Sequence, residues 1–213
     1  GWEAPLAAAF AELGEVRDRE TVTGAVAAQL NAAGAPVIVL PPPAKVPADP
    51  VATVRSAAFQ GVLLDLLGFT LAAGEDDGAA EGASPKPRKA VSAKLARLHR
   101  QVARDGARFD ALEEAAQHRV RKRLKRLRYL AEVVGGLFEA RAVKHYLAQL
   151  RPAQDALGEH NDAWVALAMY RDAAQQGHAE AWFAVGWLQA RLPMTVKVCG
   201  KALAKVSDAS RFW

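Results

Sequence analysis

The most informative stretch of the sequence is residues 118–129, which read HRVRKRLKRLRY. Each residue of a helix turns the chain by about 100°, so this stretch predicts an amphipathic helix with two distinct faces. The polar face gathers cations with a histidine and a tyrosine: His118, Arg121, Lys122, Lys125, Tyr129 and Glu132, with Arg128 at its edge. The apolar face is a narrow stripe that we expect to dock on a helical bundle: Val120, Leu124, Leu127, Ala131 and Val134. Three further arginines flank the stripe and are expected to reach solvent: Arg119, Arg123 and Arg126.

Residues 118–129 concentrate like charges, which destabilise an isolated helix. Eight cationic or titratable side chains fall on three turns, and each like-charge pair at i,i+4 costs roughly a few tenths of a kcal/mol. A bound anion would relieve this repulsion, because arginine presents a fork to two anionic oxygens, lysine supplies a point charge and His118 adds a titratable donor. Basic helices also occur as solvated faces and in nucleic-acid binders, so charge alone does not identify the partner.

The basic residues of the chain are concentrated in its middle. The net charge is +5, but residues 86–151 carry 18 of the 28 Lys and Arg residues against 6 Asp and Glu. The middle segment therefore stands at +12 and the remaining residues together at −7. Such segregation predicts one basic face, and a basic face indicates a polyanionic partner.

The composition predicts an all-α globular protein. Hydrophobic residues make up 51% of the 213 residues and charged residues 24%, which excludes a disordered chain. Alanine dominates and β-branched runs are scarce, which favours helices. The sequence has no run of about 18 or more apolar residues, so we expect no membrane span. The single cysteine, Cys199, rules out an intrachain disulfide and favours a reducing cytoplasm.

Glycine, proline and acidic residues divide the sequence into two halves. They are dense over residues 74–87, which predicts a linker there. We expect the first helical half over residues 1–73 and a second helical bundle over residues 88–213. Helices are expected over residues 5–13, 19–32 and 49–73 in the first half, and near 88–106, 111–139, 141–157, 162–176, 178–191 and 194–208 in the second.

A short internal repeat links the two halves. Residues 13–15 with Asp18 match residues 157–159 with Asp162 at an offset of 144 residues. A helix that ends at Leu-Gly, followed by an aspartate that caps the next helix, predicts a helix–corner–helix unit used twice. The repeat places the counterpart of the basic helix before Gly1. We therefore expect the first bundle to lack its N-terminal basic helix, as in a truncated chain.

Four separate motifs, in the right order, resemble one protein family. The pattern His-x-x-Arg-(x)3-Lys-x-x-Arg-Tyr at residues 118–129 resembles the signature of the CHAD family, the conserved histidine α-helical domain. Residues 157–162 resemble its Leu-Gly-x-x-Asn-Asp corner, and residues 13–18 resemble its Leu-Gly-x-x-Arg-Asp corner. Lys201, Lys205 and the closing residues 212–213 are similar to a CHAD C-terminus. The resemblance therefore covers nearly the whole chain.

The resemblance implies both a fold and a ligand. It implies two four-helix-type bundles related by pseudo-two-fold symmetry, with basic residues that line a central groove. Family members bind inorganic polyphosphate, and some are found on polyphosphate or polyhydroxyalkanoate granules. Carried over residue by residue, the expected polyphosphate site comprises His118, Arg121, Lys122, Lys125 and Arg128, with Arg17, Arg55, Lys197 and Lys201 on its other side and rim.

The sequence offers little support for an enzyme. CHAD domains are sometimes fused to a triphosphatase tunnel domain, but that domain needs a β-barrel and a Glu-x-Glu-x-Lys motif, and neither occurs in this sequence. No P-loop and no His-Glu-x-x-His motif is present, so we expect no catalysis, no cofactor and no metal site. The other histidines are scattered without the spacing of metal ligands: His99, His145, His160 and His178.

Two binding alternatives remain open. A single-strand or RNA reader is the first, but such proteins interleave aromatic residues with cations, whereas only Tyr129 accompanies the basic helix. A general polyanion binder belongs to the same class. The second alternative is a granule scaffold with a protein partner, whose basic face serves solubility. Four tryptophans lie on apolar stripes and are expected in the core: Trp2, Trp164, Trp182 and Trp187.

Overall fold

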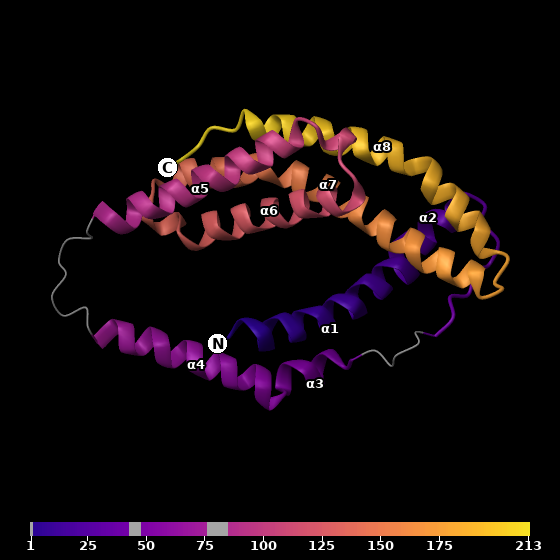
Figure 1. Cartoon of the computed structure of the whole chain (residues 1–213), viewed down its shortest axis with the longest axis horizontal. Coiled ribbons are helices and arrows are strands. Elements are labelled where there is room, and N and C mark those ends of the chain that lie inside the picture. Colours follow the sequence, from indigo (N-terminus) through magenta and orange to yellow (C-terminus); the bar gives the residue numbers. More distant parts are fainter. Residues whose placement is uncertain (1, 43–47, 76–84) are drawn as a thin grey trace. The chain divides into compact units, whose positions relative to one another are not determined.

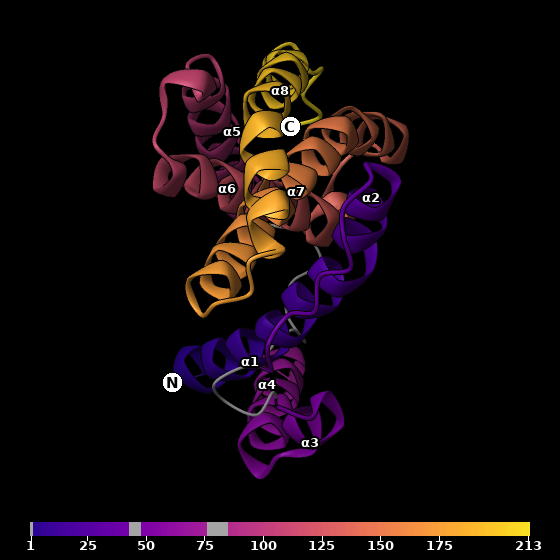
Figure 2. The ribbon, with the colours of Figure 1, turned by 90° about the vertical axis from the view of Figure 1, so that its right-hand side faces the viewer.

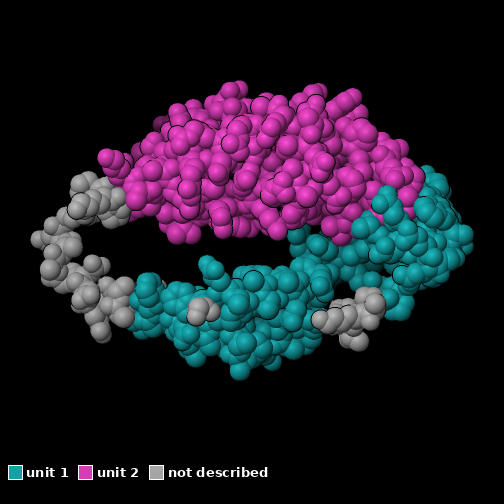
Figure 3. Space-filling model, in the orientation of Figure 1, with its two compact units in different colours: residues 1–83, 168–184 teal, residues 84–167, 185–213 magenta. Residues whose placement is uncertain are grey.

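The computed structural model describes residues 2–42, 48–75 and 85–213, and these residues form an all-helical protein. No strand occurs in these three segments, so the predicted all-α class is confirmed. Contacts divide the chain into two compact units, which Figure 3 shows in different colours. Unit 1 comprises Gly1–Ala83 and Ala168–Ala184, and unit 2 comprises Ser84–Leu167 and Val185–Trp213. Most of the linker predicted over residues 74–87 lies outside the described residues, so the predicted domain boundaries stay a prediction.

In unit 1, the first helix packs on the two helices of residues 50–55 and 57–75 (Figure 1). Thr53 donates a hydrogen bond from its hydroxyl to Glu12 Oε2 at 3.0 Å, and the Trp2 and Phe69 rings meet edge to face at 5.5 Å. The helical elements are α1 (Glu3–Thr21), which continues through a π-helical turn (Val22–Val26) into α2 (Ala27–Ala32), then α3 (Pro50–Arg55) and α4 (Ala57–Glu75).

Local signals set several helix ends in unit 1 as predicted. Asp49 caps α3, since its carboxylate accepts a hydrogen bond from the backbone N–H of Val51 at 3.0 Å. Gly34 follows α2 with a φ of +81°, a conformation that other residues rarely adopt. The single helix predicted over residues 49–73 is wrong at Ser56, which is extended with ψ of 145°. The Ser56 hydroxyl accepts a hydrogen bond from the backbone N–H of Phe59, which starts α4 afresh.

The two predicted helix corners are wrong. Helix α1 runs through Gly14 and Asp18, and α7 (Ala140–Gln175) runs through Gly158 and Asp162 without a break. A glycine inside a helix costs only about 1 kcal/mol relative to alanine, and buried residues on both sides of it outweigh that cost. For the same reason Pro193 does not end α8 (Ala181–Ser207), where two separate helices were predicted.

Unit 2 is a four-helix bundle with one continuous core. It consists of α5 (Pro85–Gly106), α6 (Glu114–Val133), the part of α7 before Ala168 and the part of α8 after Ala184 (Figures 1 and 2). A 3-10 turn (Phe109–Ala111) joins α5 to α6, and another (Gly135–Leu137) lies between α6 and α7. All four helices contribute to the core: Leu95, Leu98 and Val102; Val120, Leu124, Leu127 and Ala131; Tyr146, Leu150, Ala153 and Leu157; Cys199, Leu203 and Val206.

Some apolar side chains lie at the surface. Helix α4 exposes five large apolar residues, between 38% and 71% of each side chain's reference area: Leu63, Leu64, Leu67, Phe69 and Leu71. Trp182, which was expected in the core, is 53% exposed, and Trp2, Trp164 and Trp187 are only partly buried. Within the described segments, no helix combines the length and the apolar character that crossing a membrane requires.

Candidate polyanion-binding site

Helix α6 docks through the stripe that the sequence predicts. Val120, Leu124, Leu127 and Ala131 are buried in the core of unit 2. Their burial fixes the rotation of the helix about its axis, so the flank with His118 faces α7 and the opposite flank faces α5. The position of every cation on α6 therefore follows from the apolar spacing.

Two hydrogen bonds join the basic flank of α6 to α7. His118 Nδ1 lies 3.0 Å from Asn161 Oδ1, and Arg128 donates from Nη1 to Gln154 Oε1 at 3.0 Å. The residue numbers rise on α6 and fall on α7, so the two helices run antiparallel. We call this surface the α6–α7 seam: His118, Arg121, Lys125 and Arg128 with Gln154 and Asn161.

The remaining side chains of the seam are arranged along the same flank. Arg121 and Lys125 are partly buried between His118 and Arg128, whereas Lys122 and Tyr129 are exposed. The four cations predicted on α6 and His118 thus lie on or beside one surface, and all but Lys122 are partly buried. Cations that are partly withdrawn from water interact more strongly with an anion than fully solvated ones.

The contact with Asn161 assigns a role to each nitrogen of His118. The amide oxygen of Asn161 accepts only, so Nδ1 of the imidazole carries the proton and donates it. This leaves Nε2 for a second partner.

Arg128 is held by several neighbours at once. Besides Gln154, its Nε lies 3.4 Å from Glu132 Oε1 but makes no hydrogen bond, and its guanidinium lies 5.0 Å from the centre of the Tyr129 ring. Glu132 is one turn away on the same helix and largely exposed, so water screens this ion pair. Arg128 is therefore oriented, with only partial compensation of its charge.

On the opposite flank of α6, an arginine is paired with a buried carboxylate. Arg123, which was expected to reach solvent, is partly exposed and in addition forms an ion pair with Asp105 of α5. Asp105 is only 6% exposed and also meets Arg104 at 3.0 Å and Arg108 at 3.8 Å. The sequence did not predict this ion pair because the partner of Arg123 lies on another helix, 18 residues away in the sequence. This cluster is structural.

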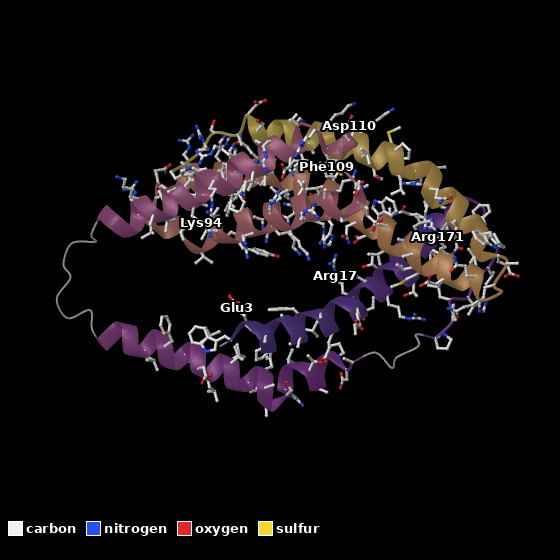
Figure 4. The ribbon with its side chains drawn as sticks, in the orientation of Figure 1. Glu3, Arg17, Lys94, Phe109, Asp110 and Arg171 are labelled. Atoms are coloured by element: carbon white, nitrogen blue, oxygen red, sulfur yellow. The ribbon has the colours of Figure 1, made fainter. Side chains whose placement is uncertain are left out.

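A buried polar network lies below the His118 end of the seam, and the sequence analysis did not identify it. His160 is buried, with Nδ1 at 2.8 Å from Thr195 Oγ1 and Nε2 at 2.8 Å from Gln117 Oε1. Gln117 in turn donates to the backbone carbonyl of Phe109, labelled in Figure 4, at 3.2 Å. Desolvation lowers the pKa of His160 below its ordinary value, so the ring is neutral at pH 7.

This network ties α6, α7 and α8 together next to the residues that hold His118. Gln117 precedes His118 in the sequence, and His160 precedes Asn161. Helical spacing was the available signal, since Ala153, Ala156 and Leu157 place His160 on the buried side of α7. Among the residues described, no three His, Cys, Asp or Glu side chains come together as metal ligands would.

The other predicted site residues belong to other helices. Arg17 on α1, labelled in Figure 4, and Arg55 at the end of α3 are exposed in unit 1. Lys197 and Lys201 are exposed on α8, on the side that faces away from the buried Cys199. The structure therefore brings together the predicted residues of α6, and the assignment of the four others to one groove stays a prediction.

Comparison with known proteins gives one match. The model of the family described as CHAD domain matches residues 1–171, which is most of the chain. The match includes the whole of α6 and the part of α7 that carries Gln154 and Asn161. The search of curated proteins and the search of solved structures found no match.

Proposed function

Since the chain belongs to the CHAD domain family, we propose that it binds inorganic polyphosphate along the α6–α7 seam, without catalysis. The observation that carries this proposal is the contrast between the two flanks of α6. Arg123 on one flank forms an ion pair with the buried carboxylate of Asp105. His118 and Arg128 on the other flank are oriented by the amide oxygens of Asn161 and Gln154, and the carboxylate near Arg128, that of Glu132, is exposed and compensates its charge only in part.

A neutral amide positions a cation without cancelling its charge. Each amide oxygen accepts one hydrogen bond, which limits the rotation of the donor but adds no negative charge. A cation that serves only the fold is expected to meet a carboxylate, as Arg123 does. Cations that are oriented and only partly neutralised favour an anionic ligand, and their orientation before binding reduces the entropy lost on binding.

The spacing of the seam suits a linear phosphate chain. His118 and Arg128 are ten residues apart, which corresponds to about 15 Å along the helix. A flexible chain of phosphates that runs along α6 can therefore meet each cation in turn. The arginine fork matches two phosphate oxygens, and lysine interacts as a point charge.

Single-stranded nucleic acid is the second candidate, and Tyr129 is the observation in its favour. Its ring is 48% exposed beside the seam, where a base could stack on it. However, the Arg128 guanidinium already lies over this ring at 5.0 Å, so a stacked base would have to displace it. A ligand without bases can bind without displacing Arg128 from the Tyr129 ring, and we therefore favour polyphosphate.

A pair of charge-matched variants tests the seam. Arg121→Gln with Lys125→Gln removes two cations from the seam, whereas Arg119→Gln with Arg126→Gln removes two exposed cations from the same helix outside it. We expect the seam variant to lose affinity for long-chain polyphosphate by on the order of 100-fold, and the control by about threefold or less. Thermal unfolding of both variants checks that the fold is retained.

The outcome is decisive because both variants lose the same charge. Equal losses would mean that the protein responds to net charge alone, and no loss in either would refute the seam as the binding site. For the native protein, the logarithm of affinity should fall linearly with the logarithm of salt concentration. Polyphosphate should also outcompete single-stranded DNA at equal phosphate concentration, and equal competition would favour a general polyanion binder.

Two further consequences of the proposal can be measured. Incubation with polyphosphate and Mg²⁺ should release no orthophosphate, since we propose binding without hydrolysis. In cells that store polyphosphate, a fluorescent fusion should gather at the granules, and the seam variant should spread through the cell. Granule association that survives loss of the seam would indicate a protein partner instead.

A further inference from the structure

Unit 2 contains a second basic surface, away from the α6–α7 seam. A hollow of about 750 Å³ lies between the last turns of α5 and the residues that end α8 and follow it. Four arginines and a histidine line it, and one carboxylate is present among them: Arg97, His99, Arg100, Arg104, Asp208 and Arg211. This composition differs from that of an ordinary surface depression, where both signs of charge alternate.

The hollow continues along α5. A neighbouring hollow of about 670 Å³ is lined by Lys89, Ser92, Ser210, Arg211 and Trp213. Arg211 lines both, so together they form one groove between α5 and residues 207–213, which we call the α5–tail groove. From Lys89 to Arg104 the groove follows 15 residues of helix, or about 22 Å.

The positive charge of the groove is not compensated. Arg97, Arg100 and Arg211 form no ion pair with any residue that the structure describes. Arg104 contacts Asp105, but that carboxylate is shared with two other arginines and cannot neutralise all three. The groove therefore keeps an excess of cations after its single lining carboxylate is counted.

The wall formed by the tail is fixed in place. The backbone N–H of Ser210 donates to Gln149 Oε1 at 3.1 Å, and the Trp213 ring meets Tyr146 edge to face at 5.0 Å. Arg211 lies between these two anchored residues. On the floor, His99 Nδ1 is 3.0 Å from the Tyr146 hydroxyl. The nearby charge of Arg211 adds to desolvation in lowering the pKa of His99.

We infer that the α5–tail groove is a second anion-binding site, which takes an inorganic oligophosphate independently of the α6–α7 seam. Its length and its row of uncompensated arginines suit a linear anion with several charges, since each guanidinium can take two oxygens of one phosphate. The choice of ligand rests on the proposed function, whereas the existence of the site rests on the groove itself.

Titration with tripolyphosphate, followed by calorimetry, tests the second site. The groove variant is Arg97→Gln, Arg100→Gln and Arg211→Gln. Its control removes three exposed cations outside both surfaces, Lys94→Gln, Arg141→Gln and Lys144→Gln; Figure 4 labels Lys94 on α5. The native protein and the control should bind at two sites. The groove variant should keep the seam site, and its affinity at the α5–tail groove should fall about tenfold or more.

The seam variant separates this inference from the proposed function. If that variant loses all tripolyphosphate binding, the second site does not exist and the proposed function stands. If the groove variant behaves like its control, the groove is not a binding site, and the seam variant alone decides the proposed function. If the groove variant loses all binding and the seam variant loses none, the proposed function fails and the groove stands. ATP is the second titrant, and tighter binding of ATP than of tripolyphosphate would overturn the choice of an inorganic ligand.

Discussion

Helices α5 and α8 approach each other closely at Gly106, which leads to a sharp prediction. A Cβ atom at Gly106 would lie 2.9 Å from Leu203 Cβ, and 3.5 Å from both Cγ and Cδ1 of the same leucine. Leu203 is buried in the core of unit 2. Its Cβ is fixed to the backbone, so no change of rotamer relieves the contact. Gly106→Ala must therefore push the two helices apart.

The expected cost follows from two opposing effects. Overpacking a core costs about 1–3 kcal/mol, whereas alanine improves helix propensity by at most about 1 kcal/mol, and by less at the last residue of a helix. The net expectation is a loss of about 1–2 kcal/mol in the free energy of unfolding, which lowers Tm by about 2–8 °C for a chain of this size.

Gly158 is the matched control. It lies inside α7, and a Cβ there would meet nothing within 4 Å. Gly158→Ala should therefore stabilise the protein by about 0.5–1 kcal/mol, because only the propensity effect remains. Urea unfolding followed by far-UV circular dichroism measures both variants. Stabilisation by Gly106→Ala, or destabilisation by Gly158→Ala, would refute this account of the α5–α8 contact.

Three further predictions follow from buried polar groups. Asp105→Asn leaves Arg123 without a counter-charge and should destabilise the fold by about 2–3 kcal/mol in urea; an unchanged midpoint would show that the pair is not structural. Burial lowers the pKa of both His99 and His160, so the unfolded chain binds protons that the folded chain does not. Stability should then fall as pH drops below about 6.5, and a Tm that stays constant from about pH 7.5 to 5.5 would contradict this. Burial also raises the pKa of the Cys199 thiol to about 12, so the folded protein should resist iodoacetamide near neutral pH; rapid alkylation would mean that unit 2 opens.

The sequence predicted best where one helix carried the whole pattern. The apolar spacing of Val120, Leu124 and Leu127 correctly placed the basic flank of α6, because the rotation of a helix depends only on its own buried stripe. It predicted poorly where packing outweighs a local signal. Gly14 and Gly158 are ordinary stop signals, but here both lie inside continuous helices.

Features formed by segments that are distant in the sequence could not be predicted from the sequence. Arg123 resembles any flanking arginine until α5 brings Asp105 against it. The α5–tail groove joins residues about a hundred positions apart, such as Arg100 and Arg211, and no local pattern connects them. His160 is intermediate, since its spacing on α7 indicated burial but not its partners.

The apolar surface of α4 limits the methods by which the melting curves of these variants can be recorded. Leu64, Phe69 and Leu71 are more than half exposed, and hydrophobic dyes fluoresce when they adsorb to surfaces of this kind. In scanning fluorimetry the dye would therefore report on α4 in the native state and give a high baseline that hides the transition. Melting curves of the variants are better recorded without any reporter molecule.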